Sequence, residues 1–199
     1  MTTIRRNYAS VLLAIVSLIS LSSAAAFAQE SQQTSTVNIK NFGQMDERFF
    51  RGGQPKENEY RELAALGIKT VIDLREDPKE YEKPAVEALG MRYVNIAMSD
   101  KDYPPAAKIE EFLKLIDDPA TGKFYVHCAG GRHRTGVIGA VYRFNHYGWD
   151  YEKVYAEMKK YDFYTRWGHG DMKKFVKDYA ANFHKNAVDA AATTGGVKH

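Results

Sequence analysis

Short apolar runs alternate with amphipathic stretches along this chain from about residue 37 onward. Runs rich in Val, Ile, Phe and Tyr are typical of buried strands. Stretches with apolar residues three and four positions apart are typical of helices, and within 106–117 such residues share one face (Ile109, Phe112, Leu113 and Ile116). The pattern predicts strands at 37–39, 48–51, 70–74, 91–97 and from Phe124, and helices at 57–66, 81–89, 106–117, up to His146, 151–161 and 171–184.

Most of the predicted strands and helices follow one another in turn, and Gly67 and Gly90 mark the ends of two helices. This order predicts an α/β fold with a mostly parallel central sheet flanked by helices on both faces. Ligands of such sheets bind at the carboxyl ends of the strands. Polar or reactive residues that follow a strand are therefore the first candidates for a functional site.

The N-terminal segment has the layout of a secretory signal. Arg5 and Arg6 precede an apolar stretch, small residues follow, and Ala28 ends a motif typical of signal cleavage. The apolar stretch is shorter than the roughly 20 residues of a membrane span, although an uncleaved anchor remains the alternative. We expect a signal peptide at 1–28, a flexible linker at 29–36, one folded domain at 37–186 and a disordered tail at 187–199. The mature protein is then secreted or periplasmic, without stable membrane insertion.

The composition limits the kinds of ligand that the chain is expected to bind. The chain carries 28 basic and 25 acidic residues, and without Arg5 and Arg6 the basic count falls to 26. Such a balance does not indicate nucleic-acid binding, so any preference for anions must be local. The histidines are scattered, without cysteine or carboxylate partners at ligand spacing, so we expect neither a metal site nor a cofactor.

The chain has one cysteine, Cys128, and an internal disulfide is therefore impossible. An unpaired thiol in an exported protein indicates chemistry rather than architecture. The alternative is an inert cysteine buried in a turn, because a free cysteine often behaves as a small core residue.

The segment around this cysteine reads His-Cys-Ala-Gly-Gly-Arg-His-Arg-Thr-Gly, between a strand-like run and a helix-like run. A strand, tight loop and helix start points several N–H groups at one spot, which favours phosphate and stabilises a thiolate. Arg134 can hold two phosphoryl oxygens with its planar fork, and Thr135 can donate a hydrogen bond to the sulfur. We expect Cys128 to attack phosphorus, with phosphate bound by the loop residues (Ala129, Gly130, Gly131, Arg132, His133 and Arg134).

The pattern His-Cys-x5-Arg-Thr-Gly resembles the signature loop of the cysteine-based protein tyrosine and dual-specificity phosphatases. This resemblance implies a tyrosine-phosphatase-like fold, a phosphoenzyme on Cys128 and a phosphate-binding role for Arg134. The loop positions occupied by Arg132 and His133 vary in the family and help to set substrate preference. His127 is expected to orient the loop by hydrogen bonds rather than to transfer protons.

A phosphatase of this kind also needs an acid that protonates the leaving oxygen. The segment 98–105 resembles the family's movable Trp-Pro-Asp-x-Gly-x-Pro loop, with Asp100 at the aspartate. Met98 and Ser99 depart from the pattern, and Asp102 replaces the glycine. Asp100 is the preferred general acid, and Asp102 is the alternative.

Two further segments, 50–55 and 71–75, resemble the compact, atypical dual-specificity phosphatases of bacteria, which are similar to eukaryotic enzymes acting on inositol pyrophosphates. Arg51 and Arg75 could contact substrate there, but structural ion pairs or hydrogen bonds are the preferred interpretation. Asp73 is expected to fix a loop near the site. By resemblance to this branch, the segment 161–171, with Arg166, Trp167 and His169, lies beside the phosphate loop. An aromatic and a cation there could line a substrate pocket, but the preferred interpretation is that Trp167 packs in the core and Arg166 lies in solvent.

The leading prediction is an exported, metal-independent phosphomonoesterase of the dual-specificity type, active as a monomer. Its substrate is a phosphorylated protein or, alternatively, an inositol polyphosphate or pyrophosphate. Two alternatives from other classes are a rhodanese-like sulfurtransferase and a non-catalytic phospho-ligand binder. The x5 spacing, Thr135 and an upstream acid argue against the first, and the joint presence of Cys128, Arg134 and an aspartate argues against the second.

Overall fold

The computed structural model describes residues 37–166 and 168–194. Five strands form one sheet in the order β1-β2-β5-β3-β4. β1 is antiparallel to β2, and the other neighbours are parallel. The strands are β1 Gly43–Gln44, β2 Phe49–Gly52, β3 Thr70–Asp73, β4 Arg92–Asn95 and β5 Phe124–His127. The predicted signal peptide, the linker and Trp167 lie outside the described residues.

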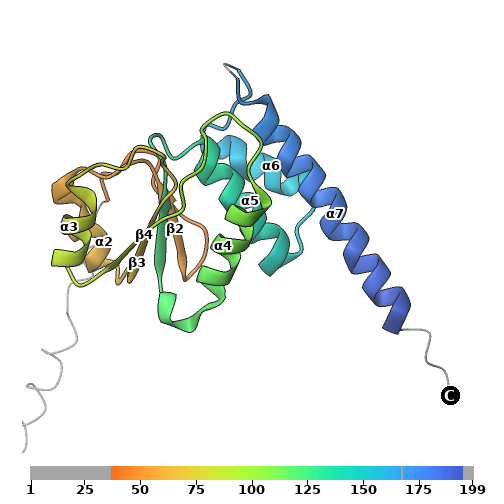
Figure 1. Cartoon of the computed structure of the whole chain (residues 1–199), viewed down its shortest axis with the longest axis horizontal. Helices are drawn as coiled ribbons and strands as arrows, with labels where there is room; N and C mark the ends of the chain where they lie inside the picture. The colour runs from red at the N-terminus through yellow and green to blue at the C-terminus, as the bar shows by residue number, and fades with distance from the viewer. Residues whose placement is uncertain (1–36, 167, 195–199) are drawn as a thin grey trace, which may run out of the picture. The chain divides into compact units, whose positions relative to one another are not determined.

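Helices cover both faces of the sheet (Figure 1), which confirms the predicted fold class. The helical segments are η1 Glu57–Glu59, α2 Tyr60–Ala65, α3 Glu82–Ala88, α4 Ala106–Asp117, η2 Pro119–Thr121, α5 His133–Tyr147, α6 Tyr151–Lys160 and α7 Gly170–Thr194. α2 and α3 lie on one face, and α4, α5, α6 and α7 lie on the other. Each face has its own apolar core, because side chains alternate between the two sides of a strand: Phe50 and Tyr125 belong to one core, and Phe49 and Phe124 to the other.

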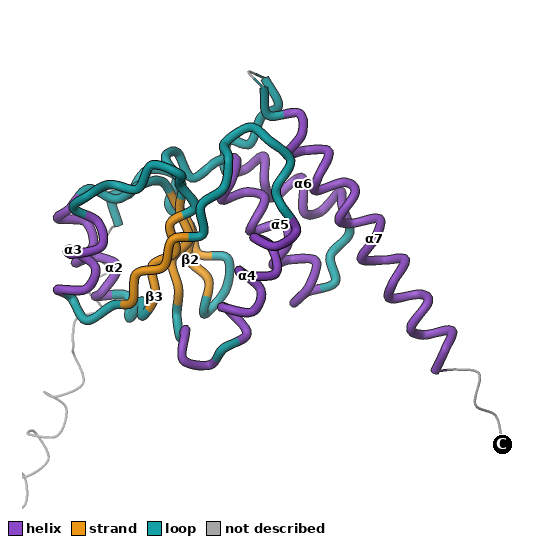
Figure 2. Tube along the Cα trace, in the orientation of Figure 1, coloured by secondary structure: helices purple, strands orange, loops and turns teal. Residues whose placement is uncertain are grey.

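The parallel register brings the ends of three strands together. His127 at the end of β5 pairs with Gly52 of β2 on one side and with Asp73 of β3 on the other. The loops that leave these strands gather along one edge of the sheet (Figure 2). The segment that follows β5 begins with Cys128, so the candidate nucleophile sits at the carboxyl edge, as expected for a parallel sheet.

The sequence prediction was wrong for residues 37–39, which form no strand. The backbone N–H of Asn38 donates to the carboxylate of Glu62, and the carbonyl of Ile39 accepts from Phe42 in a turn. Asn41 has a positive φ of 56°, and its side-chain amide donates to the carbonyls of Gly131 and Tyr161. The chain turns here to reach the loop after β5, and this long-range contact overrides the local strand pattern.

The predicted disordered tail is also wrong for residues 187–194, because α7 continues to Thr194. This stretch is rich in alanine, the residue with the highest helix propensity, and glycines follow at 195 and 196. Residues 195–199 lie outside the described part of the chain.

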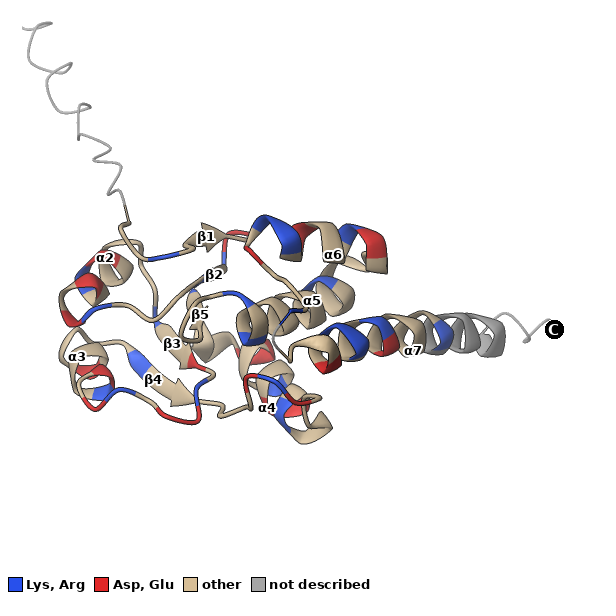
Figure 3. Cartoon of the chain, turned by 90° about the horizontal axis from the view of Figure 1, so that it is seen from above, with Lys and Arg blue, Asp and Glu red and all other residues tan. Residues whose placement is uncertain are grey.

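Lys and Arg are interspersed with Asp and Glu over the described helices (Figure 3). This distribution agrees with the near-balanced composition, so anion binding depends on local geometry. Of the helices within 37–166 and 168–194, none is both long and apolar enough to span a bilayer.

The loop after β5 is seated directly on the end of β2. Gly131 has a φ of +66°, and a Cβ there would lie 2.4 Å from the carbonyl carbon of Gly52. Its carbonyl oxygen accepts hydrogen bonds from Arg51 Nη2 at 2.7 Å and from Asn41 Nδ2 at 3.0 Å. Only glycine allows both this backbone conformation and this approach.

Replacement of Gly131 by alanine should therefore destabilise the protein more than replacement of a glycine with open surroundings. Gly90 is a matched control, because its φ is +74° and a Cβ there meets nothing within 4 Å. Each variant suffers the backbone penalty of roughly 1–2 kcal/mol. Gly131→Ala should lose a further ~1–3 kcal/mol from the clash in urea unfolding. Equal losses in the two variants would contradict this seating of the loop.

Candidate active site

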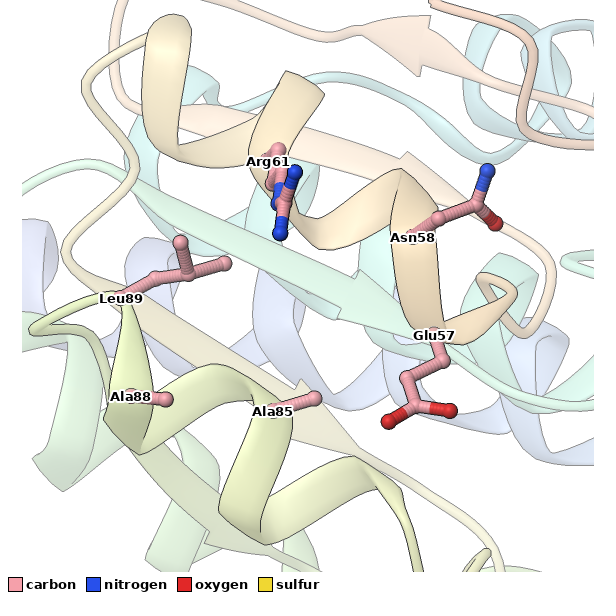
Figure 4. A pocket seen from close by; sticks show the side chains of 6 residues that line it. All are labelled: Glu57, Asn58, Arg61, Ala85, Ala88 and Leu89. Carbon is pink, nitrogen blue, oxygen red and sulfur yellow. The ribbon is translucent and has the colours of Figure 1, made fainter.

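A small cavity of about 200 Å³ opens at the carboxyl edge of the sheet. Its lining comes from the loop after β5 (Cys128, Ala129, Gly130, Arg132, His133 and Arg134) and from two other segments (Asp100, Tyr164 and His169). A larger cavity of about 520 Å³ lies between α2 and α3 (Figure 4), lined by Glu57, Asn58, Arg61, Ala85, Ala88 and Leu89. The larger cavity offers no strong nucleophile. The chemistry therefore belongs to the smaller one.

The sulfur of Cys128 is held in a setting that favours the thiolate. Burial alone would raise the pKa of this thiol, because the side chain is only 4% exposed. The hydroxyl and backbone N–H of Thr135, the charge of Arg134 and the N–H of Gly130 outweigh burial, and the pKa is lowered. α5 begins at His133, so the sulfur also faces the positive end of a helix dipole.

Arg134 is positioned by the backbone of two neighbouring segments. Its Nη1 donates to the carbonyls of Leu74, at 3.4 Å, and Met98, at 3.2 Å. The side chain is 7% exposed, and within the described residues no hydrogen bond occupies its Nε or Nη2. Part of the guanidinium is thereby fixed while the other donors remain available to an oxyanion.

Arg51 and Arg75 make structural ion pairs and hydrogen bonds, as the preferred interpretation of the sequence had it. Arg51 is buried, donates to the carbonyl of Gly131 and stacks on Tyr161 at 3.9 Å from the ring centre. Burial lowers the pKa of Arg51 to about 10, so the guanidinium is still charged at neutral pH beneath the loop. Arg75 pairs with Asp77 at 2.7 Å and donates to Gln54 at 2.8 Å, and it does not line the cavity.

His127 lies behind the nucleophile and is fully buried. Its Nε2 is 2.6 Å from Glu82 Oε1, and its Nδ1 is 3.8 Å from Asp73 Oδ1. Burial alone would lower the pKa of His127, but the two carboxylates outweigh it and the pKa is raised. The buried imidazole is therefore held between two acidic groups behind the nucleophile, in keeping with an orienting role.

Glu82 is the member of this cluster that the sequence did not reveal. It opens α3, far along the chain from His127, and its other oxygen accepts from Gln54 Nε2 at 3.0 Å. Asp73, Glu82 and His127 present ligand-type atoms within 4.8 Å of one another. Nε2 of His127 and Oε1 of Glu82 lie 2.6 Å apart, which is an ion-pair distance for a protonated imidazole and a carboxylate.

The two candidate acids occupy different surroundings. Asp100 lines the cavity that contains Cys128. Asp102 lines a separate hollow beside Tyr103 and Pro104. The turn is fixed by Ser99, whose hydroxyl oxygen accepts from the backbone N–H of Asp102 at 3.2 Å. Of the two aspartates, the structure brings only Asp100 together with the nucleophile.

Two residues of the connection between α6 and α7, Tyr164 and His169, also line the cavity. Arg166 is exposed. His169 belongs to the segment 161–171, for which the sequence allows either pocket lining or structural packing. Tyr164 has no sequence signal of its own. Gly131 and Thr135 do not line the cavity but support the loop behind it. The carbonyl of Gly131 accepts a hydrogen bond from Arg51, and Thr135 lowers the pKa of the Cys128 thiol.

Comparison with known proteins agrees with this geometry. A family described as a dual-specificity and tyrosine phosphatase fused to NAD+ kinase matches residues 19–178. A Mycosarcoma maydis protein assigned by inference as tyrosine-protein phosphatase OCA1 is 31% identical over 110 residues, 52% of this chain and 68% of that protein. Inositol diphosphatase DSP1 of Oryza sativa subsp. japonica is 26% identical over 127 residues, 61% of this chain and 56% of that protein.

Solved structures show the same fold. The core catalytic domain of the PP-IP phosphatase SIW14 from S. cerevisiae aligns with a TM-score of 0.62 at 20% identity, over 77% of this chain and 94% of that one. TpbA of P. aeruginosa aligns with a TM-score of 0.59 at 23% identity, over 70% and 84%. The family match and the curated relatives, rather than these structures, support a phosphatase over a sulfurtransferase. The chain is therefore a cysteine-based phosphatase and belongs to the family of dual-specificity phosphatase domains described as fused to NAD+ kinase.

Proposed function

We propose that Cys128 carries out phosphoester hydrolysis through a phosphocysteine intermediate. The thiolate attacks phosphorus, the bond to the leaving oxygen breaks, and Asp100 gives that oxygen a proton. Water then attacks the phosphocysteine, Asp100 accepts a proton from it, and the sulfur leaves as thiolate with inorganic phosphate as product. The observation that carries this proposal is the lowered pKa of a buried thiol that faces a cavity beside Arg134.

The remaining loop residues have supporting roles in this proposal. The backbone N–H groups from Ala129 to His133 bind the phosphoryl oxygens, and Arg134 binds two of them through its fork. Thr135 stabilises the sulfur as it leaves. No step uses a metal or a cofactor.

The thiolate predicts a distinct pH dependence. A lowered pKa means that the reactive anion persists at lower pH, so the rate of iodoacetamide alkylation of Cys128 should have its midpoint below the ordinary ~8.5. Thr135→Val removes the hydroxyl and should move that midpoint upward.

Cys128→Ser should lose turnover by several orders of magnitude while it still binds tungstate. Turnover near wild type in the serine variant would refute the covalent mechanism.

The general acid is identified by leaving-group dependence. Asp100→Asn should slow hydrolysis of phenyl phosphate by about 10²-fold or more, because a basic leaving oxygen needs a proton. The loss should be much smaller for a phosphate ester of an acidic phenol. Asp102→Asn is the matched control and should behave as wild type with both esters. The opposite ranking of the two variants would assign the acid to Asp102.

For the substrate we propose a phosphorylated protein, with an inositol polyphosphate or pyrophosphate as second candidate. Relatives named as tyrosine phosphatases support the first, and those named as inositol diphosphatases support the second. A specific observation favours the second candidate. Arg132 lines the cavity with 30% of its side chain exposed, 3.7 Å from Asp162, and so offers another cation beside Arg134 for a further phosphate.

A substrate panel separates these candidates. Phosphopeptides and inositol phosphates should be hydrolysed with chelator present, since neither step needs a metal. Arg132→Ala should reduce kcat/KM about tenfold or more for a densely phosphorylated inositol, and less for a phosphopeptide, because only the former presents a second phosphate. An equal effect on both classes would remove the argument for the inositol substrate.

We also propose that residues 1–28 direct export, on the strength of Arg5, Arg6, the apolar stretch and the motif ending at Ala28. Protein recovered outside the cytoplasm should then begin at Gln29, and an N-terminus at Met1 would argue for an anchor.

A further inference from the structure

The loop that carries Asp100 lacks the residues with which the family's pattern begins, since Met98 and Ser99 occupy those positions. On either side of Asp100, Ser99 accepts from the N–H of Asp102, and Arg134 donates to the carbonyl of Met98. The backbone of Asp100 itself is contacted by another segment: the ring of His169 lies with Nδ1 2.8 Å from the carbonyl oxygen of Asp100. Residues 69 positions apart are joined there by one hydrogen bond.

The partner atoms define how the ring is protonated. A carbonyl oxygen only accepts hydrogen bonds, so Nδ1 of His169 carries the proton and donates it. The same reasoning applies to His133, whose Nε2 lies 3.1 Å from the carbonyl oxygen of Tyr164. Each imidazole therefore donates one N–H to a backbone carbonyl of another segment.

The two imidazoles are stacked on each other. Their ring centres are 3.5 Å apart and their planes differ by 14°, and the residues are only 7% and 9% exposed. Burial and the neighbouring His169 lower the pKa of His133 to about 4, so this ring is neutral near pH 7. A neutral ring can stack closely on its neighbour without charge repulsion. The tyrosine ring of Tyr164 meets both imidazoles edge-on.

This arrangement ties three segments into one unit. His133 belongs to the start of α5 and the phosphate loop, His169 belongs to the connection before α7, and Asp100 belongs to the loop before α4. All three line the cavity that contains Cys128. A displacement of His169 would therefore move the Asp100 backbone relative to the sulfur, whereas Asp102 lies in another hollow and has no such tie to the cavity.

We propose that His169 is a positioning residue for the general acid: stacked on His133, it holds the Asp100 backbone by its Nδ1–H and fixes the distance between the carboxyl group and the leaving oxygen. The inference rests on the proposed role of Asp100. It assigns to the connection between α6 and α7 the task of holding the backbone at Asp100. His169 itself does not exchange protons with the substrate.

Two substitutions of His169 separate the effect of its hydrogen bond from the effect of its ring stacking. The side-chain amide of His169→Asn can donate from nearly the place of Nδ1, but the ring is lost. His169→Phe keeps an aromatic ring for the stack and loses the donor. If the hydrogen bond positions the acid, the asparagine variant should stay within about threefold of wild type with phenyl phosphate. The phenylalanine variant should fall about tenfold or more, part of the 10²–10⁴-fold that acid catalysis supplies.

The leaving group and a double variant exclude a general structural effect. His169→Phe should act on the ester of an acidic phenol within about threefold of wild type, because that leaving oxygen needs little protonation. Combined with Asp100→Asn, it should cause no further loss with phenyl phosphate, since both changes remove the same step. Thermal unfolding of each variant verifies that it is folded.

Different failures have different meanings. If Asp100→Asn shows the leaving-group dependence and His169→Phe does not, or if the two losses multiply, the positioning role is wrong and the proposed function stands. If His169→Asn falls as far as His169→Phe, the hydrogen bond is not the working contact and the inference is overturned. If Asp100→Asn itself has no effect, the proposed acid is wrong and the inference fails with it.

Discussion

A negative sulfur almost removed from water is the constraint on which the rest of this structure depends. Burial of Cys128 disfavours the thiolate, and only oriented donors that stay fixed can reverse that preference. The donors here are the hydroxyl and N–H of Thr135, the N–H of Gly130 and the charge of Arg134. Since a dipole is useful only in one orientation, the loop must be held rigidly, and much of the surrounding architecture serves that purpose.

Buried polar groups lie beneath the loop and behind it. Arg51 donates to the carbonyl of Gly131, and the backbone of Gly131 packs against Gly52. Behind the sulfur, His127 meets Glu82, and Glu82 accepts from Gln54. The opposite charges of His127, Glu82 and Asp73 reduce the free-energy penalty of burying each of them.

The opposite wall of the cavity contains two stacked imidazoles. His133 and His169 are nearly buried, face backbone carbonyls and stack on each other. The pKa of His133 is lowered to about 4 by burial and by His169, so His133 carries no charge near pH 7 that would repel the neighbouring ring. The site thus combines a positively charged floor, which attracts the phosphoryl group, with a wall of stacked rings that sets the position of Asp100.

The local sequence pattern predicted the α/β class, α4 and the loop from Cys128 to Gly136, because apolar periodicity and loop chemistry depend on residues that are neighbours in the chain. Tertiary structure decided what depends on distant segments. It turned residues 37–39 away from the sheet, placed Asp100 rather than Asp102 in the cavity, and brought Glu82 to His127 and His169 to His133. Asp100 was already the preferred acid from the resemblance of its segment, but the pairs Glu82–His127 and His169–His133 have no sequence signature, because each arises from the register of the strands and the packing of segments far apart along the chain.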